Sequence, residues 1–475
     1  MIDFGIFPLI TLLNVVIAIP VTIHVLLRKQ NERAAISWIG LIWLAPFVGA
    51  LTYYLFGINR IQRKANRLRK TRHEPLPNLA ATQPRLTGVP GPVERLMRLG
   101  ARVHPQPFVA GNGVEPLVNG EAAYPAMLEA IASARGSVAL STYIFELDRA
   151  GSRFVEALTQ AQRNGAEVCV ILDDVGSSRF PRRVDTPLEK AGVKTARFIP
   201  RRLGRYLRFV NLRNHRKILL VDGQAGFVGG MNIRAGHLPD ARPRRAIQDV
   251  HFRVRGPVLD QMADVFEEDW EFSRGETIAL PRWKGTTLPL DADRTLARVI
   301  ADGPDVDFEK LHWILCGALA AAERRVRVQT PYLLPDEIVS SALKLAALRG
   351  VEVEILIPER SDWVVMQWAM QSNFGRLLAH GIKLYRVPPP FDHSKLFLVD
   401  DRWALIGSSN WDARSLRLNF ELDLECIDGA LCARLAALFD GKKARSRPLT
   451  AAELAGRSLP VQLRDNFARL FSPFL

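Results

Sequence analysis

Two short phrases in the chain carry the same reactive side chains at the same spacing. Each has a histidine, a lysine two residues later and an aspartate at the end of an apolar run: His215, Lys217 and Asp222 in the first, and His393, Lys395 and Asp400 in the second. On a β-strand, residues two apart point to the same face, so each histidine shares a face with its lysine. Lysine supplies a compact cation, and histidine exchanges a proton near neutral pH. Two such half-sites indicate one shared site for phosphate chemistry.

A turn rich in glycine, serine and asparagine follows each phrase, at residues 229–232 and 407–410. Amide side chains and the exposed backbone of small residues can add neutral hydrogen-bond donors close to an anion. Asn232, Asn410 and Ser408 are therefore candidate phosphate-binding residues. Further landmarks recur at a nearly constant offset, such as Thr142-Tyr143 and Thr330-Pro331-Tyr332, which is typical of a tandem domain pair.

The doubled pattern HxKxxxxD, followed by G-G/S-x-N, resembles the phospholipase D superfamily. Two apolar N-terminal segments, the phrases at residues 213–217, 329–336 and 410–415, and the ending at 469–475 resemble bacterial cardiolipin synthases of the phospholipase D type. This resemblance spans almost the whole chain. It implies an α/β fold with two tandem phospholipase D-like domains, whose mixed sheets form one shared active site, preceded by two transmembrane helices.

The resemblance also implies an orienting carboxylate further along each half, and the matching positions are Asp249 and Glu421. Such a carboxylate fixes the tautomer of a catalytic histidine and stabilises its imidazolium form. Asp222 and Asp400 belong to the motif and are counted among the candidate catalytic residues. Their expected role is to brace the turn or to pair with a nearby cation.

A pair of histidines can exchange a phosphodiester in two steps. One imidazole attacks phosphorus and becomes a phosphohistidine, while the other protonates the leaving oxygen and then deprotonates the incoming hydroxyl. With Lys217 and Lys395 stabilising the phosphate, we expect neither a metal nor a cofactor. Analogy with the superfamily, and the cationic neighbours of His215, favour His215 as the nucleophile.

His393 is then the general acid and later the base. Glu421 has one more methylene than Asp249, and we expect it to follow His393 as that residue takes and returns a proton.

Composition restricts the partners. The chain has 475 residues, a formal charge of +15 and a pI near 10.0, which favour an anionic partner such as an acidic membrane surface or nucleic acid. Its four cysteines have no paired spacing and lie in apolar runs, which predicts buried, reduced thiols: Cys169, Cys316, Cys426 and Cys432. The catalytic part is thus expected in a reducing compartment.

The uncharged segments at residues 4–27 and 34–57 each reach the ~20 residues that cross a bilayer, which predicts two transmembrane helices. A single span with a re-entrant or buried hairpin would also fit these segments. More lysines and arginines follow the second segment than lie between the two, so the positive-inside rule predicts a multi-pass protein with cytoplasmic catalytic domains. The resemblance implies that the membrane is the bacterial inner membrane.

The expected organisation has four parts: an anchor at 1–58, a basic, Pro/Gly-rich linker at 59–116, and phospholipase D-like domains at 117–290 and 291–475. Within both domains, helical and strand patterns alternate, which favours α/β layers. The spacing of Trp363, Met366, Trp368 and Met370 favours a helix packed in the core over a lipid-facing lip.

The resemblance implies a cardiolipin synthase that moves a phosphatidyl group from one phosphatidylglycerol to another and releases glycerol. The expected partners are phosphatidylglycerol, other anionic phospholipids and the membrane, and not nucleic acid; the oligomeric state stays open. A phospholipase D hydrolase or head-group exchange enzyme would use the same residues. A nuclease of the superfamily would use the same positive charge on nucleic acid. A noncatalytic lipid-binding scaffold would tolerate the loss of a histidine or a lysine, whereas both motifs are complete in this chain.

Overall fold

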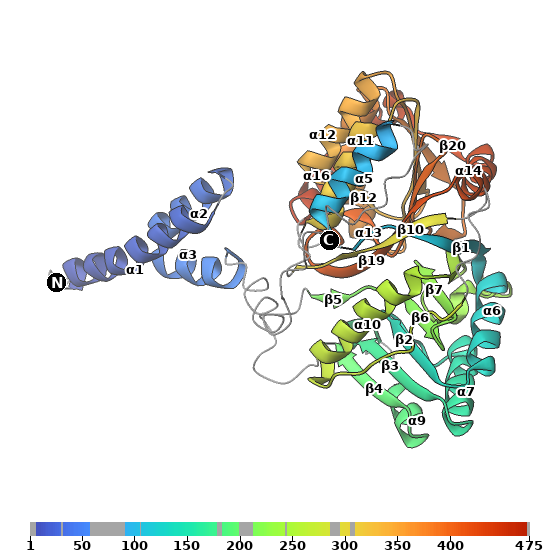
Figure 1. Cartoon of the computed structure of the whole chain (residues 1–475). Helices are drawn as coiled ribbons and strands as arrows, with labels where there is room; N and C mark the ends of the chain where they lie inside the picture. The colour runs from blue at the N-terminus through green and yellow to red at the C-terminus, as the bar shows by residue number, and fades with distance from the viewer. Residues whose placement is uncertain are drawn as a thin grey trace. The chain divides into compact units, whose positions relative to one another are not determined.

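The computed structural model describes residues 6–29, 32–57, 91–104, 106–177, 183–198, 212–242, 245–285, 295–304 and 309–472. These residues form two compact units, an N-terminal one and a larger one that contains both motifs (Figure 1). The expected boundaries at residues 58–59 and 290–291 lie outside the described residues.

The N-terminal unit consists of apolar helices: α1 (Ile6–Arg28), α2 (Glu32–Leu44), α3 (Pro46–Thr52) and a π-helical turn at Tyr53–Gly57. Ala18, Val25, Ile42 and Tyr53 form its small buried core. The second apolar segment is broken at Ala45, where φ is −144°. Pro46 begins the next helix, because proline lacks the N–H that would continue the preceding one.

None of the helices described has both the length and the apolar character needed to cross a membrane. The expectation of two transmembrane helices is therefore not met. For the second segment the break explains the result, because α2 has 13 residues and α3 has 7, each fewer than the ~20 that a crossing helix requires.

The larger unit is built on one continuous mixed sheet. Among the described residues it has 16 strands, in the order β20-β14-β13-β11-β16-β17-β19-β10-β1-β9-β7-β6-β2-β3-β4, with β5 paired to β19. The two halves meet where β10 pairs antiparallel with β1. On either side of this junction the strands follow in matching order, as expected for a tandem duplication.

The first half alternates strands and helices: β1 (Val109–Val118), α6 (Asn119–Ser133), β2 (Ser137–Thr142), α7 (Arg149–Arg163), β3 (Glu167–Asp173), α8 (Asp174–Ser177), α9 (Asp185–Lys190), β4 (Lys194–Phe198), β5 (Arg213–Asn214), β6 (Ile218–Val221), β7 (Ala225–Gly229), β8 (Ile247–Gln248), β9 (Val250–Arg255) and α10 (Val258–Arg274). In Figure 1, α10 lies on one side of these strands, and α6 and α7 lie on the other. This layering buries the sheet on both faces.

The second half repeats the plan: β10 (Thr295–Asp302), α11 (Lys310–Ala321), β11 (Arg325–Gln329), β12 (Leu333–Leu334), α12 (Glu337–Leu348), β13 (Glu352–Pro358), α13 (Val364–Leu378), β14 (Lys383–Val387), β15 (Phe391–Asp392), β16 (Leu396–Val399), β17 (Trp403–Gly407), β18 (Trp411–Asp412), β19 (Asn419–Ile427), α14 (Gly429–Ala444), β20 (Arg447–Pro448), α15 (Ala451–Ala455) and α16 (Leu459–Arg469). The predicted strands and helices of both halves are present. Met366 and Met370 lie in the core, as favoured, whereas Trp363 is exposed.

The folded body begins earlier than the expected start near residue 117. An amphipathic helix, α5 (Gly91–Val103), buries Leu96 against α11, and β1 lies between β9 and β10 in the sheet. The pattern at residues 93–99 predicts a short helix inside the linker, and α5 confirms it. The linker prediction was wrong for β1, because Gly111, Gly113 and Pro116 interrupt its strand pattern. An irregular register between Val109 and Asn112 accommodates Gly111, whereas Gly113 and Pro116 pair regularly with β9.

Candidate active site

Short strands that cross between the halves position both histidines. β5 comes directly before His215 and pairs with β19, so that Phe420 lies opposite Asn214 and the His215 amide donates to the Phe420 carbonyl at 2.9 Å. In the same way β15 pairs with β8, and the His393 amide donates to the Gln248 carbonyl at 2.8 Å. Each histidine is thereby placed beside the carboxylate of the other half.

The side-chain contacts also cross between the two halves. His215 Nδ1 lies 2.9 Å from Glu421 Oε2, and His393 Nδ1 lies 3.0 Å from Asp249 Oδ2. The expectation that Glu421 accompanies His393 was wrong, because the register of β5 on β19 brings Glu421 to His215. With Nδ1–H donating to a carboxylate, Nε2 keeps the lone pair that can meet phosphorus or a proton. At His393 this nitrogen lies 3.1 Å from Lys395 Nζ.

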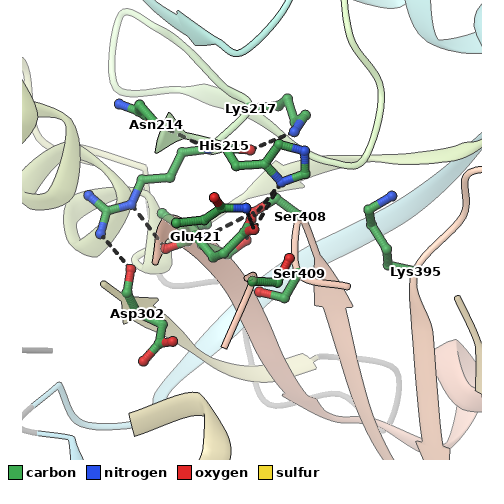
Figure 2. A network of polar contacts seen from close by, with 12 residues as sticks. Asn214, His215, Lys217, Asp302, Lys395, Ser408, Ser409 and Glu421 are labelled. Atoms are coloured by element: carbon green, nitrogen blue, oxygen red, sulfur yellow. Dashed lines mark hydrogen bonds and ion pairs between the residues drawn. The ribbon is translucent and has the colours of Figure 1, made fainter. Parts of the chain in front are cut away.

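Glu421 is held by several donors besides His215. Ser408 Oγ donates to its Oε2 at 2.6 Å, and Asn419 Nδ2 donates to its Oε1 at 3.0 Å. Figure 2 shows the imidazole directed at Glu421, with Ser408 beside the carboxylate. Arg216 is fully buried, and its Nε donates to the Glu421 backbone carbonyl at 2.9 Å. Ser408 was a candidate phosphate ligand, but its hydroxyl donates to the Glu421 carboxylate instead.

Asp249 has a close-packed environment of its own. Its Oδ1 accepts from the Val250 amide at 2.8 Å. Gly230, in the turn after the first motif, leaves room for it, because a Cβ there would lie 2.8 Å from Asp249 Oδ2 and 3.1 Å from the His393 carbonyl oxygen. Glycine in this turn therefore allows the two halves to approach at the site.

Both lysines are buried beside their histidines. Lys217 Nζ donates to the His215 carbonyl at 2.6 Å, and Lys395 Nζ donates to the His393 carbonyl at 2.5 Å. Burial lowers the pKa of Lys217 to about 7 and that of Lys395 to about 8, against the pull of the nearby carboxylates. A bound phosphate would restore the charged form of both amines, so the site is suited to an anion.

The protonation of the histidines follows the same logic. Burial, reinforced by Lys217, lowers the pKa of His215 to about 4, although Glu421 acts in the opposite direction. The pKa of His393 is lowered by burial and by Lys395 and Lys217. Both imidazoles are thus neutral without an anion, and a phosphodiester beside them would raise their pKa.

The carboxylates of Asp249 and Glu421 differ in the direction of their pKa shifts. Burial raises the pKa of Asp249, with Lys395 opposing the shift. Burial would raise the pKa of Glu421 as well, but His215, Lys217 and Ser408 outweigh it and lower that pKa to about 2. Glu421 is therefore the more firmly ionised partner.

The motif aspartates do not reach the site. Asp222 follows β6, at the end of that strand away from Lys217, and its carboxylate accepts from the backbone amides of Arg135, Gly136 and Ser137 at 2.6–2.8 Å. Asp400 accepts in the same way from residues 323–325. Asp222 and Asp400 were therefore wrongly counted among the catalytic candidates. Each braces a turn, as expected, and each has a positive φ in that turn.

We expect Asp222→Ala to lower the free energy of unfolding by about 1–3 kcal/mol, because three backbone amides lose their acceptor. Urea denaturation measures this change. Activity per folded molecule should stay within about twofold of wild type, because the aspartate lies outside the histidine cleft. A large loss of activity with unchanged stability would return Asp222 to the catalytic residues.

Both histidines line one cleft of about 340 Å³ between the halves. Asn232 and Asn410 also line it. Asn232 Oδ1 accepts from the Ile144 amide at 3.1 Å, whereas Asn410 Oδ1 is buried without a hydrogen-bond partner within the described part of the chain. The bond to Ile144 leaves Asn232 Nδ2 as the donor for an anion, whereas the Asn410 oxygen can accept only from a donor such as a hydroxyl.

Sequence reasoning missed several cleft residues. Tyr143 packs edge-on against His215 with ring centroids 5.0 Å apart, and Tyr332 occupies the matching place at 6.5 Å from His393. Their recurrence at equivalent positions was the available signal. The walls also carry basic residues and a second set of polar and aromatic groups: Arg213, Arg234, Arg414, His237, Asp362, Trp363, Phe391 and Asp412.

The comparisons with known proteins agree with this geometry. A family model described as "Cardiolipin synthase, PLD-like domain" matches residues 127–270 and 315–442, and one described as "Phospholipase D-nuclease N-terminal" matches residues 16–57. Cardiolipin synthase A of Pseudomonas aeruginosa is 34% identical over 95% of this chain and 93% of its own length. The probable cardiolipin synthase YwiE of Bacillus subtilis is 29% identical over 95% and 90%.

Among solved structures, a phosphatidylserine synthase from Haemophilus influenzae matches with a TM-score of 0.64 at 15% identity, covering 80% of this chain and 100% of that one. This match concerns the fold alone. Two phospholipase D-like halves, joined in one sheet around a two-histidine cleft, define the class of protein. The chain belongs to the cardiolipin synthase family of phospholipase D-like proteins.

Proposed function

We propose that this chain synthesises cardiolipin by transferring a phosphatidyl group between two phosphatidylglycerol molecules, with glycerol as the second product. The observation that carries the proposal is the doubled half-site: two histidines line one cleft, each fixed at Nδ1 by a carboxylate and each beside a lysine. Such a pair can supply a nucleophile and an acid–base group to one phosphorus atom. The relatives named cardiolipin synthase A support the choice of lipid.

The proposed exchange has two steps. With the phosphodiester bound, His393 takes up a proton on Nε2. His215 Nε2 then attacks phosphorus, the bond to the glycerol oxygen breaks, and His393 gives that oxygen its proton. The primary hydroxyl of a second phosphatidylglycerol then gives its proton to His393 and attacks the phosphohistidine, which frees His215. One phosphodiester replaces another, so the reaction needs no external energy source, and removal of glycerol drives it forward.

Residues with distinct tasks surround this exchange. Glu421 stabilises the positive charge on the His215 ring while phosphorus is attached, and Asp249 does so for His393 while it carries a proton. Lys217 and Lys395 stabilise the charge on the phosphate oxygens. Asn410 contributes a neutral polar contact. Each of these roles is a proposal that substitution can test.

The N-terminal unit suits a role at the membrane. Its helices expose large apolar side chains, including Leu27 at 77%, Ile36 at 70% and Leu44 at 88% exposure. Exposed apolar surface on this scale marks an interaction with lipid or protein. We propose that this unit holds the enzyme at the bacterial inner membrane, with the catalytic body on the cytoplasmic side.

The direct test is to incubate the purified protein with phosphatidylglycerol vesicles and to identify the lipids by mass. Cardiolipin and glycerol in equal amounts support the proposal. Phosphatidic acid as the main product would show a hydrolase, and a new head group on addition of another alcohol would show an exchange enzyme. Cleavage of DNA with no lipid product would show a nuclease, and no turnover would leave a lipid-binding scaffold.

We expect turnover to persist in excess chelator, because Lys217 and Lys395 supply the cationic charge that a divalent ion supplies at other phosphoryl-transfer sites. The initial rate of cardiolipin formation should change by less than about twofold. Vesicle aggregation should be followed in parallel by light scattering, since divalent ions also act on anionic lipid. Loss of turnover in chelator and its recovery with added Mg²⁺ or Zn²⁺ would contradict this prediction.

A further inference from the structure

The last helix of the chain exposes an apolar stripe. On α16 and the turn after it, five large apolar residues are between 46% and 68% exposed: Leu459, Leu463, Phe467, Leu470 and Phe471. At 100° per residue they fall within one side of the helix. The opposite side is buried, with Asp465 and Ala468 turned toward the body. Folded soluble proteins rarely leave such a stripe uncovered.

The stripe leads toward the mouth of the catalytic cleft. The Arg464 guanidinium lies 4.5 Å from the centre of the Trp368 ring, while Arg457, earlier in the chain, reaches Gln371 at 3.5 Å. α16 therefore runs antiparallel to α13, and its C-terminal end approaches the start of α13. That start carries Trp363, which lines the cleft, and Val364; their exposures are 40% and 53%.

The charges on the helix favour an anionic surface. Asp465 is the only acidic residue between Leu459 and Arg469, and it is fully buried and paired with Arg457 and Arg464 at 2.7 and 2.8 Å. The exposed side of α16 thus presents apolar side chains flanked by arginine and no carboxylate. This is the pattern of a helix that lies in the interface of an acidic bilayer.

We propose that α16 docks the catalytic body onto a bilayer of anionic phospholipid, so that the cleft mouth at Trp363 faces the surface from which lipid is drawn. The proposal rests on the proposed function, because only a lipid substrate requires the cleft to face a membrane. It adds a second attachment to that of the N-terminal unit, located on the catalytic body itself. Two other partners could cover the stripe instead: a second copy of the chain, or the N-terminal unit.

The test uses the full chain with Leu463→Glu and Phe467→Glu, singly and together. The control is Ala437→Glu, which adds the same charge at an exposed position of α14, on the opposite side of the second half from α16 in Figure 1. Rates are measured on vesicles of phosphatidylglycerol diluted in phosphatidylcholine, and on short-chain phosphatidylglycerol dissolved as monomers. For the double variant we expect the lipid concentration at half-maximal rate to rise at least about tenfold on vesicles. The rate on dissolved substrate should stay within about twofold of wild type.

An unchanged dependence on vesicles would overturn the proposal. So would an equal loss on dissolved substrate, which would place the stripe in the fold or the cleft. A shift of the double variant to a smaller assembly, without a change in vesicle dependence, would assign the stripe to a second copy of the chain.

A second measurement does not depend on catalysis. An environment-sensitive dye on Phe467→Cys should shift to shorter wavelength on vesicles and be quenched by lipids with brominated chains, whereas a dye on Ala437→Cys should not. The wild-type chain, treated with the same dye, corrects for the partly exposed Cys316. A dye already shielded without vesicles would indicate that the N-terminal unit covers the stripe. If the wild type makes no cardiolipin from either vesicles or dissolved lipid, the proposed function fails, while the dye still reports whether α16 meets the bilayer.

Discussion

His215→Ala should prevent formation of any covalent phosphoenzyme, whereas His393→Ala should still form one from a substrate with a good leaving group. Both variants should lose transfer on phosphatidylglycerol, by about 10²- to 10⁴-fold for the acid–base residue and at least as much for the nucleophile. The difference arises because p-nitrophenolate leaves without a proton, so a p-nitrophenyl phosphodiester bypasses the general acid. The carboxylate arrangement favours this assignment, since the firmly ionised Glu421 stabilises the cationic ring of a phosphohistidine at position 215.

The measurement is a rapid acid quench followed by mass analysis of the peptides that contain each histidine. His380→Ala is the control, because this histidine lies just after α13, its Nδ1 donates to the Arg376 carbonyl at 2.8 Å, and it does not line the cleft. A phosphate mapped to His393, with no adduct in His393→Ala, would reverse the two roles. The two-step mechanism would then stand with its residues exchanged.

The alternation of strands and helices in each half was predictable because its elements carry strong periodic patterns. The residues in β2 and β3 are almost entirely buried, and α7 has one apolar side, so neither depends on distant context. β1 was not predictable in this way. Its two glycines and its proline are typical of a linker, and only the pairing with β9 and β10 makes it a strand.

The reactive residues were visible in the sequence, but their partners were not. A histidine and a lysine two apart need only a local strand to share a face. The pairing of His215 with Glu421 depends instead on β5, a strand of two residues whose partner lies in the other half. No local propensity specifies such a contact, and the duplicated pattern itself suggests pairing within each half.

The roles of Asp222 and Ser408 show a second limit of prediction from the sequence. Asp222 recurs as Asp400 and caps backbone amides, whereas Ser408 has Gly230 at its equivalent position and donates to Glu421. Neither side chain lines the cleft. A residue can recur in both halves because the strand ends need it. Recurrence therefore marks equivalent positions without separating catalytic from supporting side chains.

Glu421→Gln should slow the step that His215→Ala abolishes, and Asp249→Asn should impair the step that depends on His393. Glutamine keeps the size of Glu421 and can still accept from His215 Nδ1, but it removes the negative charge that stabilises the imidazolium form. We expect transfer to fall by about 10²- to 10⁴-fold in either variant, as when the carboxylate of a histidine pair is neutralised. Asp423→Asn is the matched control for Glu421→Gln, because Asp423 is buried on the same strand. Burial raises the pKa of Asp423 to about 7, so its side chain is partly protonated near neutral pH, and asparagine resembles that neutral form.

The p-nitrophenyl substrate separates the two carboxylates. Glu421→Gln should slow the burst of p-nitrophenol that accompanies phosphoenzyme formation, because the charge on His215 rises in that step. Asp249→Asn should leave the burst nearly intact and slow the later release of the phosphoryl group, since His393 then acts as the base. Had each carboxylate served the histidine of its own half, the two variants would exchange behaviour. That outcome would contradict the cross-half pairing at 2.9 and 3.0 Å and, with it, the shared site that the crossing strands β5 and β15 build.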